Sequence, residues 1–123
     1  MKRDPDYLRT MLIDFEASSD WQHLVEEDKN NVEKRTKYYN ALLAEDLGYL
    51  NAIIMDQTGP DSIRRRYYRV TSEGYDFIDT TRDKDIWEKT KGVARDVGGL
   101  TIKAMQELAF RLVQQKLNEY AGS

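Results

Sequence analysis

Nine consecutive residues decide the fold of this chain: Leu42-Leu43-Ala44-Glu45-Asp46-Leu47-Gly48-Tyr49-Leu50. The first six suit the last turns of a helix, and Gly48 supplies a residue type that commonly ends one. Tyr49 then begins an apolar run, rich in β-branched residues, that predicts a strand as far as Met55. A two-stranded hairpin is marginal in water by itself, so a helix that leads directly into one is expected to pack on it.

The return strand of this hairpin is predicted from Ile63 to Val70, after a loop of turn residues from Asp56 to Ser62. Successive side chains of a strand point to opposite faces. One face is therefore expected to carry Arg64, Arg66, Tyr68 and Val70, and the other Arg65, Tyr67 and Arg69.

Two helices are predicted before the hairpin. Asp4 can cap the first, ahead of Pro5, and its apolar face comprises Leu8, Met11, Leu12 and Phe15. The second begins after Asn30 or Asn31 and ends near Leu47. We expect its buried stripe to be Val32, Thr36, Tyr39, Leu43 and Leu47, and its outer face to carry Lys34, Lys37 and Ala41 with Tyr38 beside them. Between the two helices, the alternation from Trp21 to Val25 indicates a short strand or an extended link.

The last third of the chain is predicted to be helical. Thr71 can cap a short helix, Asp83 the next, and Thr101 the last, with a break at Gly98-Gly99. The helix after Asp83 has a predicted inner side of Ile86, Trp87, Thr90, Val93, Ala94 and Val97. The final helix has a broader apolar surface, which comprises Ile102, Met105, Leu108, Ala109, Leu112, Val113 and Leu117.

This order of elements predicts a mainly α fold with a two-stranded β-hairpin (α+β). We interpret it as a winged helix-turn-helix with a C-terminal helical extension, although there is little room for one further helix before Asn31. Residues 1–80 are expected to form the winged-helix-like domain. Residues 81–123 would form a helical pair that packs on this domain or makes a dimer interface.

Several segments resemble a family of small bacterial and phage or prophage proteins, domain of unknown function 2513. They are Met1-Lys2-Arg3-Asp4, the Leu42–Leu50 run, Val70-Thr71-Ser72-Glu73-Gly74-Tyr75-Asp76-Phe77-Ile78-Asp79, Arg82-Asp83 and Ile86-Trp87-Glu88-Lys89-Thr90-Lys91. The resemblance implies a winged-helix-like fold and a phage or prophage origin. It implies no activity and no catalytic residue. The family often has an aromatic-His pair before Leu-Leu; Tyr38-Tyr39-Asn40 stands there in this chain, so no role of that His is transferred.

Composition and motifs favour a protein without enzymatic activity. The 123 residues suit one modest core, and the absence of Cys excludes thiolate chemistry and Cys-based metal sites. His23 is the only histidine, no carboxylate pair has the spacing of an acid–base site, and no Gly-rich phosphate loop is present. We expect no cofactor and no metal. Without an apolar stretch after Met1-Lys2-Arg3 or a membrane-spanning run, we also expect a cytoplasmic protein with no membrane partner.

A basic segment around the hairpin is the most specific functional signal. Between Asn30 and Thr71 there are seven Lys and Arg residues and five Asp and Glu residues, a difference of +2, whereas the whole chain has a net charge of −3. In a winged helix, the second helix would enter the major groove of double-stranded DNA and the wing would contact phosphates. The predicted contacts are Lys34, Arg35, Lys37 and Tyr38 on the helix and Arg64, Arg65 and Arg66 in the wing.

Three other interpretations are retained. The arginines could simply protect an edge strand from aggregation. The chain could be a protein-interaction module, for example a phage factor that binds a host protein, which keeps the fold without binding DNA. The apolar surface of the final helix near Leu108, Phe110 and Leu112 could form a homodimer, or that helix could pack back on Leu8, Met11 and Phe15.

Overall fold

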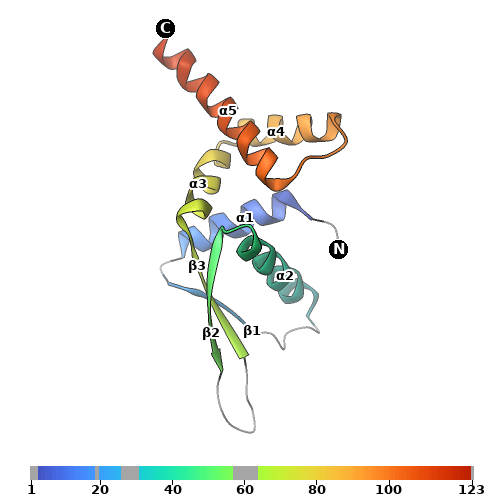
Figure 1. Cartoon of the computed structure of the whole chain (residues 1–123), viewed down its shortest axis with the longest axis vertical. Coiled ribbons are helices and arrows are strands. Elements are labelled where there is room, and N and C mark those ends of the chain that lie inside the picture. Colours follow the sequence, from blue (N-terminus) through green and yellow to red (C-terminus); the bar gives the residue numbers. More distant parts are fainter. Residues whose placement is uncertain (1–2, 19, 26–30, 57–63, 123) are drawn as a thin grey trace. The chain divides into compact units, whose positions relative to one another are not determined.

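A computed structural model describes residues 3–18, 20–25, 31–56 and 64–122 (Figure 1). The described chain is mainly helical and α+β, as predicted. Its elements are α1 (Pro5–Ala17), β1 (Gln22–Val25), α2 (Val32–Asp46), β2 (Leu50–Asp56), β3 (Arg64–Val70), α3 (Ser72–Thr81), α4 (Lys84–Asp96) and α5 (Ile102–Ala121). They form two compact units, residues 1–75 and 76–123, and the division falls inside α3. The sequence had placed a boundary at residue 80.

The first unit contains an antiparallel sheet with the strand order β1-β3-β2. The predicted hairpin pairs Leu50 with Val70 and Asp56 with Arg64. The segment expected to be a strand or a link is the strand β1, which pairs Gln22 with Tyr68 and extends the hairpin to three strands. The predicted loop tip from Gln57 to Ser62 lies outside the described residues.

The side chains of β3 alternate between two faces, as the sequence predicted, and burial follows this alternation in the part of the sheet next to α2. Leu50, Tyr68 and Val70 are buried, whereas Ile53 and Met55 on the opposite face of the sheet are exposed. α2 contacts β1 and β2, and α1 contacts α2 and β3. Asp4 caps α1 through the backbone N–H of Tyr7, and α1 buries its predicted face of Leu8, Met11, Leu12 and Phe15.

The predicted buried stripe of α2 is wrong. Ala41 and Ala44 are its fully buried residues, whereas the side chains of Val32 and Tyr39, predicted to be inside, are 64% and 37% exposed. Small side chains let the helix axis approach its neighbours closely, and close packing then determines which face is buried. The Lys37 side chain, predicted on the outer face, lies with its Nζ 5.4 Å from the centroid of the Phe15 ring of α1.

Thr71 ties the end of the hairpin to the end of α2. Its backbone N–H donates to the carbonyl of Tyr49, and its hydroxyl donates to the carbonyl of Gly48. The same hydroxyl oxygen accepts from the backbone N–H of Gly74, as expected of an N-cap. Gly48 has φ +84°, the left-handed conformation in which glycine is favoured. The Leu42–Leu50 segment therefore leaves the helix at the residue that the sequence predicted.

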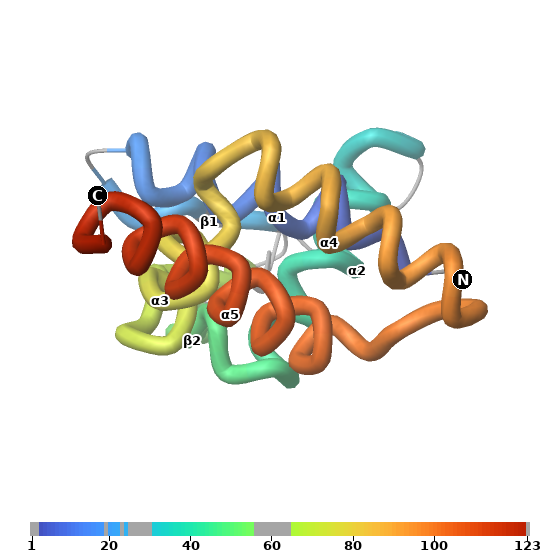
Figure 2. Tube along the Cα trace, turned by 90° about the horizontal axis from the view of Figure 1, so that it is seen from above, coloured from blue at the N-terminus to red at the C-terminus, as the bar shows by residue number. Residues whose placement is uncertain are grey.

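The second unit is built from the end of α3 and the helices α4 and α5, which contact each other (Figure 2). Asp83 and Thr101 cap α4 and α5 as predicted, and Gly98-Gly99 separates these helices. Trp87 is 1% exposed and packs edge-on against Phe77, with ring centroids 6.3 Å apart. Two predicted inner residues of α4, Val93 and Val97, are exposed instead.

Candidate binding surfaces around the hairpin

The seven residues predicted to contact DNA do not share one surface. Lys34 and Arg35 are exposed in the first turn of α2, whose N-cap is Asn31. Lys37 points toward α1, as described above. Tyr38 is half-buried, with its ring edge-on to that of Tyr39 at 6.2 Å. The helix therefore presents only the residues of its first turn as exposed cations.

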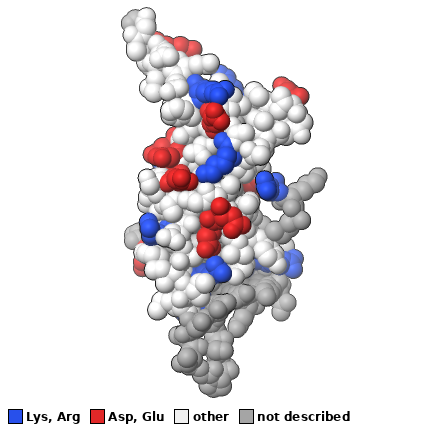
Figure 3. All heavy atoms as spheres, in the orientation of Figure 1, with Lys and Arg blue, Asp and Glu red and all other residues white. Residues whose placement is uncertain are grey.

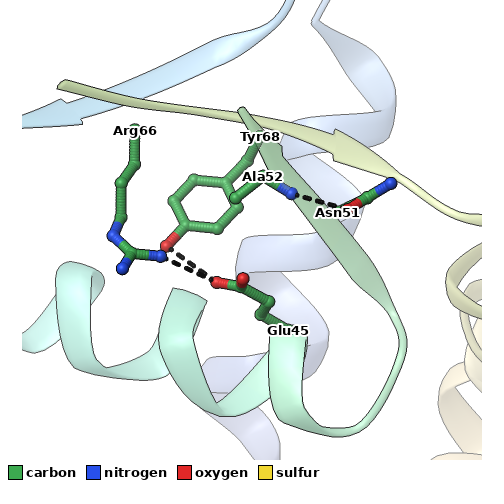
Figure 4. Close-up of polar contacts among 5 residues, drawn as sticks. All are labelled: Glu45, Asn51, Ala52, Arg66 and Tyr68. Carbon is green, nitrogen blue, oxygen red and sulfur yellow. Dashed lines mark hydrogen bonds and ion pairs between the residues drawn. The ribbon is translucent and has the colours of Figure 1, made fainter. Parts of the chain in front are cut away.

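Arg66 belongs to a polar cluster between α2 and the sheet (Figure 4). Its Nη1 lies 3.2 Å from Oε2 of Glu45 on α2, and the Tyr68 hydroxyl lies 3.5 Å from the same oxygen. The side chains of Arg66 and Glu45 are 20% and 33% exposed, so this ion pair is partly desolvated. Arg66 thus connects β3 to α2, and its guanidinium, predicted to contact phosphate, pairs with the Glu45 carboxylate.

The cluster also alters the ionisation of Tyr68. Burial raises the pKa of its phenol to about 12, the nearby Glu45 carboxylate adds to the rise, and Arg66 opposes it. A carboxylate, a guanidinium and a neutral phenol so arranged form a structural link between α2 and β3.

The opposite side of the hairpin carries a different set of side chains, which we call the open sheet face. Cross-strand neighbours on this face are Asn51 with Arg69, Ile53 with Tyr67 and Met55 with Arg65. Ile53 and Met55 are 52% and 57% exposed, Arg69 is exposed, and Arg65 and Tyr67 are half-exposed. Of the residues predicted to contact DNA, Arg65 is the one described on this face. Arg69 was not among the predicted DNA contacts, although the sequence already placed it on the same strand face as Arg65, four residues away.

Arg64 begins β3 opposite Asp56, and its side chain lies outside the described part of the structure. α2 contacts Arg66 and Tyr68 on one face of the sheet, whereas Arg65 and Arg69 are on the other. A single rigid duplex cannot therefore contact the outward side of α2 and the open sheet face together, because the sheet separates them.

The charges of the open sheet face are of one sign. Its described side chains include two arginines and no carboxylate, within a chain whose net charge is −3. On the face of the protein shown in Figure 3, Lys and Arg side chains are interspersed with Asp and Glu, and no continuous basic area is visible there. The described side chains of the open sheet face thus carry positive charge, in a chain whose net charge is negative.

No group of three or more His, Cys, Asp or Glu side chains among the described residues could hold a metal ion. No helix within the same residues is long and apolar enough to cross a membrane.

These features define a mainly helical α+β protein whose three-stranded sheet leaves one face open. The chain belongs to the family described as hypothetical protein DUF2513, whose family model matches residues 2–101. The resemblance noted from the sequence is thereby confirmed at the level of the family. Searches among curated proteins and among solved structures gave no match.

Proposed function

We propose that this chain is a non-enzymatic protein-interaction module and that its partner binds the open sheet face. The carrying observation is the combination of two exposed aliphatic side chains, Ile53 and Met55, with Arg65 and Arg69 and without any described carboxylate. Exposed apolar side chains grouped together are a common sign of an interaction site.

The composition of this face supports a protein partner. Aromatic residues, Met and Arg are enriched in the centres of protein interfaces, while Lys, Asp and Glu are depleted there. Tyr67, Met55 and the two arginines fit that pattern. The chemistry of the partner follows: an apolar segment flanked by Asp or Glu, whose carboxylates pair with Arg65 and Arg69.

The architecture suits such a scaffold. The order α1–β1–α2–β2–β3, with a helix leading straight into a hairpin, resembles that of a winged helix. Among the described residues between α1 and α2 there is one strand and no further helix. In this proposal the winged-helix-like fold holds the sheet rigid, and the sheet makes the contact.

A displayed library of random peptides tests the proposal. We expect the wild type to enrich peptides with Asp or Glu beside aliphatic or aromatic residues, and the variant Arg65→Glu/Arg69→Glu to lose them. Arg95→Glu/Arg111→Glu, at two exposed arginines of α4 and α5, is the charge-matched control and should retain them. Enrichment that is equal in all three proteins, or absent from the wild type, would refute the proposal.

Double-stranded DNA is the second candidate, and the exposure of Lys34 and Arg35 at the start of α2 favours it. If DNA is bound, Lys34→Ala/Arg35→Ala should weaken binding to all duplexes about equally and reduce the dependence of affinity on salt. A mobility-shift series at several salt concentrations measures both effects. No binding by the wild type even at low salt would discard this candidate and leave the protein partner.

A further inference from the structure

The second unit contains an open groove along α5. One hollow of about 470 Å³ is lined by Asp76, Asp79, Thr80, Lys103, Gln106, Glu107 and Phe110. A second, of about 410 Å³, is lined by Asp79, Arg82, Asp83, Ile86, Val113, Lys116, Leu117 and Tyr120. Asp79 belongs to both, so the two hollows are neighbours, and between them they follow α5 from Lys103 to Tyr120.

The residues of α5 from Phe110 onward supply the apolar wall of this groove. Ile102, Met105 and Ala109 are the buried residues of the helix, and all lie in its first half. Beyond them, Phe110, Leu117 and Tyr120 are 50%, 59% and 75% exposed, and Val113 is half-exposed. Their spacing of three, four and three residues is the a/d spacing of a coiled-coil seam.

The charged rim of the groove is largely neutralised within the chain. Asp79 pairs with Arg82 at 3.0 Å, Asp83 with Lys116 at 2.6 Å and Glu107 with Arg111 at 2.8 Å. A strongly charged ligand therefore gains little here. The groove favours an occupant that is apolar along one stripe and carries no net charge beside it.

We infer that this occupant is α5 of a second copy of the chain, docked antiparallel. In that arrangement Phe110 lies opposite the partner's Tyr120 and Val113 opposite the partner's Leu117, so each a position meets a d position. A two-fold axis that passes between the helices at the level of Gln115 relates the copies, and each α5 is both the wall of one groove and the occupant of the other. This inference is independent of the proposed function, because it uses none of the residues of the open sheet face.

The Asp83–Lys116 pair has a defined part in this dimer. Near the two-fold axis, Lys116 from each copy flanks the seam, and two unpaired ammonium groups would repel each other. Each Lys116 has its own Asp83 as a partner, which removes that repulsion. Asp83→Asn should therefore weaken the dimer, and the additional change Lys116→Gln should restore it.

Sedimentation velocity from micromolar to near-millimolar concentration tests the inference. The short seam predicts a weak dimer, so the mass should rise with concentration from 14.4 kDa toward twice that value. Leu117→Glu should hold the protein at 14.4 kDa, whereas Gln115→Glu, on the outer side of the same helix, should not. Leu117 is already 59% exposed, and circular dichroism checks that its variant is folded. If the Leu117→Glu variant is not folded, Tyr120→Glu is used in its place.

Cross-linking tests the antiparallel orientation. The chain has no Cys, so one introduced Cys is unique in each copy. A short thiol cross-linker should join two copies of Gln114→Cys, which lies beside the seam near the axis, and should leave Gln115→Cys largely unjoined. A mass that stays at 14.4 kDa at every concentration, a dimer that survives Leu117→Glu, or equal cross-linking at both positions would overturn the inference.

Discussion

Among the described glycines, Gly74 has the least space for a side chain. A Cβ built on this glycine would lie 2.2 Å from the carbonyl oxygen of Tyr49 and 2.8 Å from Cγ1 of Val70. One of these neighbours is backbone, which cannot move aside without disturbing the junction between α2 and the hairpin. The absence of a side chain here is what allows α3 to begin so close to the sheet.

We therefore expect Gly74→Ala to destabilise the protein by about 3 kcal/mol, at the upper end of the usual cost of overpacking. Gly92→Ala is the matched control, since the only atom near its added Cβ is a side-chain nitrogen of Arg95 at 4.0 Å. Because Gly92 lies inside α4, its replacement should stabilise by about 0.5–1 kcal/mol. Urea unfolding of both variants measures the difference, and equal effects would contradict this account.

Tyr68 predicts how stability changes at alkaline pH. Its pKa is about 12 in the folded protein and 10.0 ordinarily, so between these values the unfolded chain loses a proton that the folded chain retains. Stability contributed by the neutral phenol is then complete below pH 10 and lost as the pH rises toward 12. Tyr68→Phe should make the alkaline decline shallower, whereas Tyr120→Phe, at an exposed position, should not. Unfolding curves at a series of alkaline pH values test this, and parallel declines in all three proteins would refute it.

At the scale of whole elements, the ends of helices were predictable and one helix face was not. Asp4, Asn31, Asp83 and Thr101 cap their helices because capping needs only residues two or three positions apart. The face of α2 depends on what packs against it. Large apolar residues marked one side of α2 in the sequence, but the side that contacts its neighbours contains Ala41 and Ala44.

Asp83 joins two elements, since it caps α4 and pairs with Lys116 of α5. The hydrogen bond from Lys116 lowers the pKa of its carboxyl below the ordinary 3.8, and the backbone N–H of Ile86 adds to this. Stability from the carboxylate is thus present above pH 3.8 and is lost as the pH falls through the lowered pKa.

Asp83→Asn keeps a capping side chain and removes the charge, so its stability should change less than that of the wild type when the pH falls from neutral into the acid range. Lys116→Met removes the same ion pair and leaves the cap, and should behave in the same way. Unfolding at dilute protein concentration, where dimers are absent, measures the effect. If stability falls as steeply toward acid pH in both variants as in the wild type, the Asp83–Lys116 ion pair does not contribute.

For the molecule as a whole, the candidate contacts were the least predictable part. Arg64, Arg65 and Arg66 are adjacent in sequence, yet strand alternation sends Arg65 to the open sheet face and Arg66 to Glu45, 21 residues earlier in the chain. Alternation itself was predicted correctly. The sequence did not predict which face of the sheet α2 would cover, because that depends on the tertiary packing of the helix.

Each compact unit contains one tryptophan, and the two should differ in their contribution to stability. Trp87 is 1% exposed in the second unit, so Trp87→Ala should cost about 3–5 kcal/mol, as for other buried aromatic truncations. Trp21 is 39% exposed in the first unit, and Trp21→Ala should cost about 1 kcal/mol or less. Urea unfolding followed by circular dichroism compares them, and a larger loss for Trp21→Ala would contradict the described packing.

The strand order β1-β3-β2 has a kinetic consequence. To complete the sheet, Gln22 must find Tyr68 across a long stretch of chain, whereas α4 and α5 are joined by a short turn at Gly98-Gly99. Contacts between residues distant in sequence form more slowly than local ones. On dilution from denaturant, the fluorescence of Trp87 should therefore reach its native value before that of Trp21. On the ribosome the order of emergence is the reverse, so the slower half has a head start during synthesis that it lacks in the test tube.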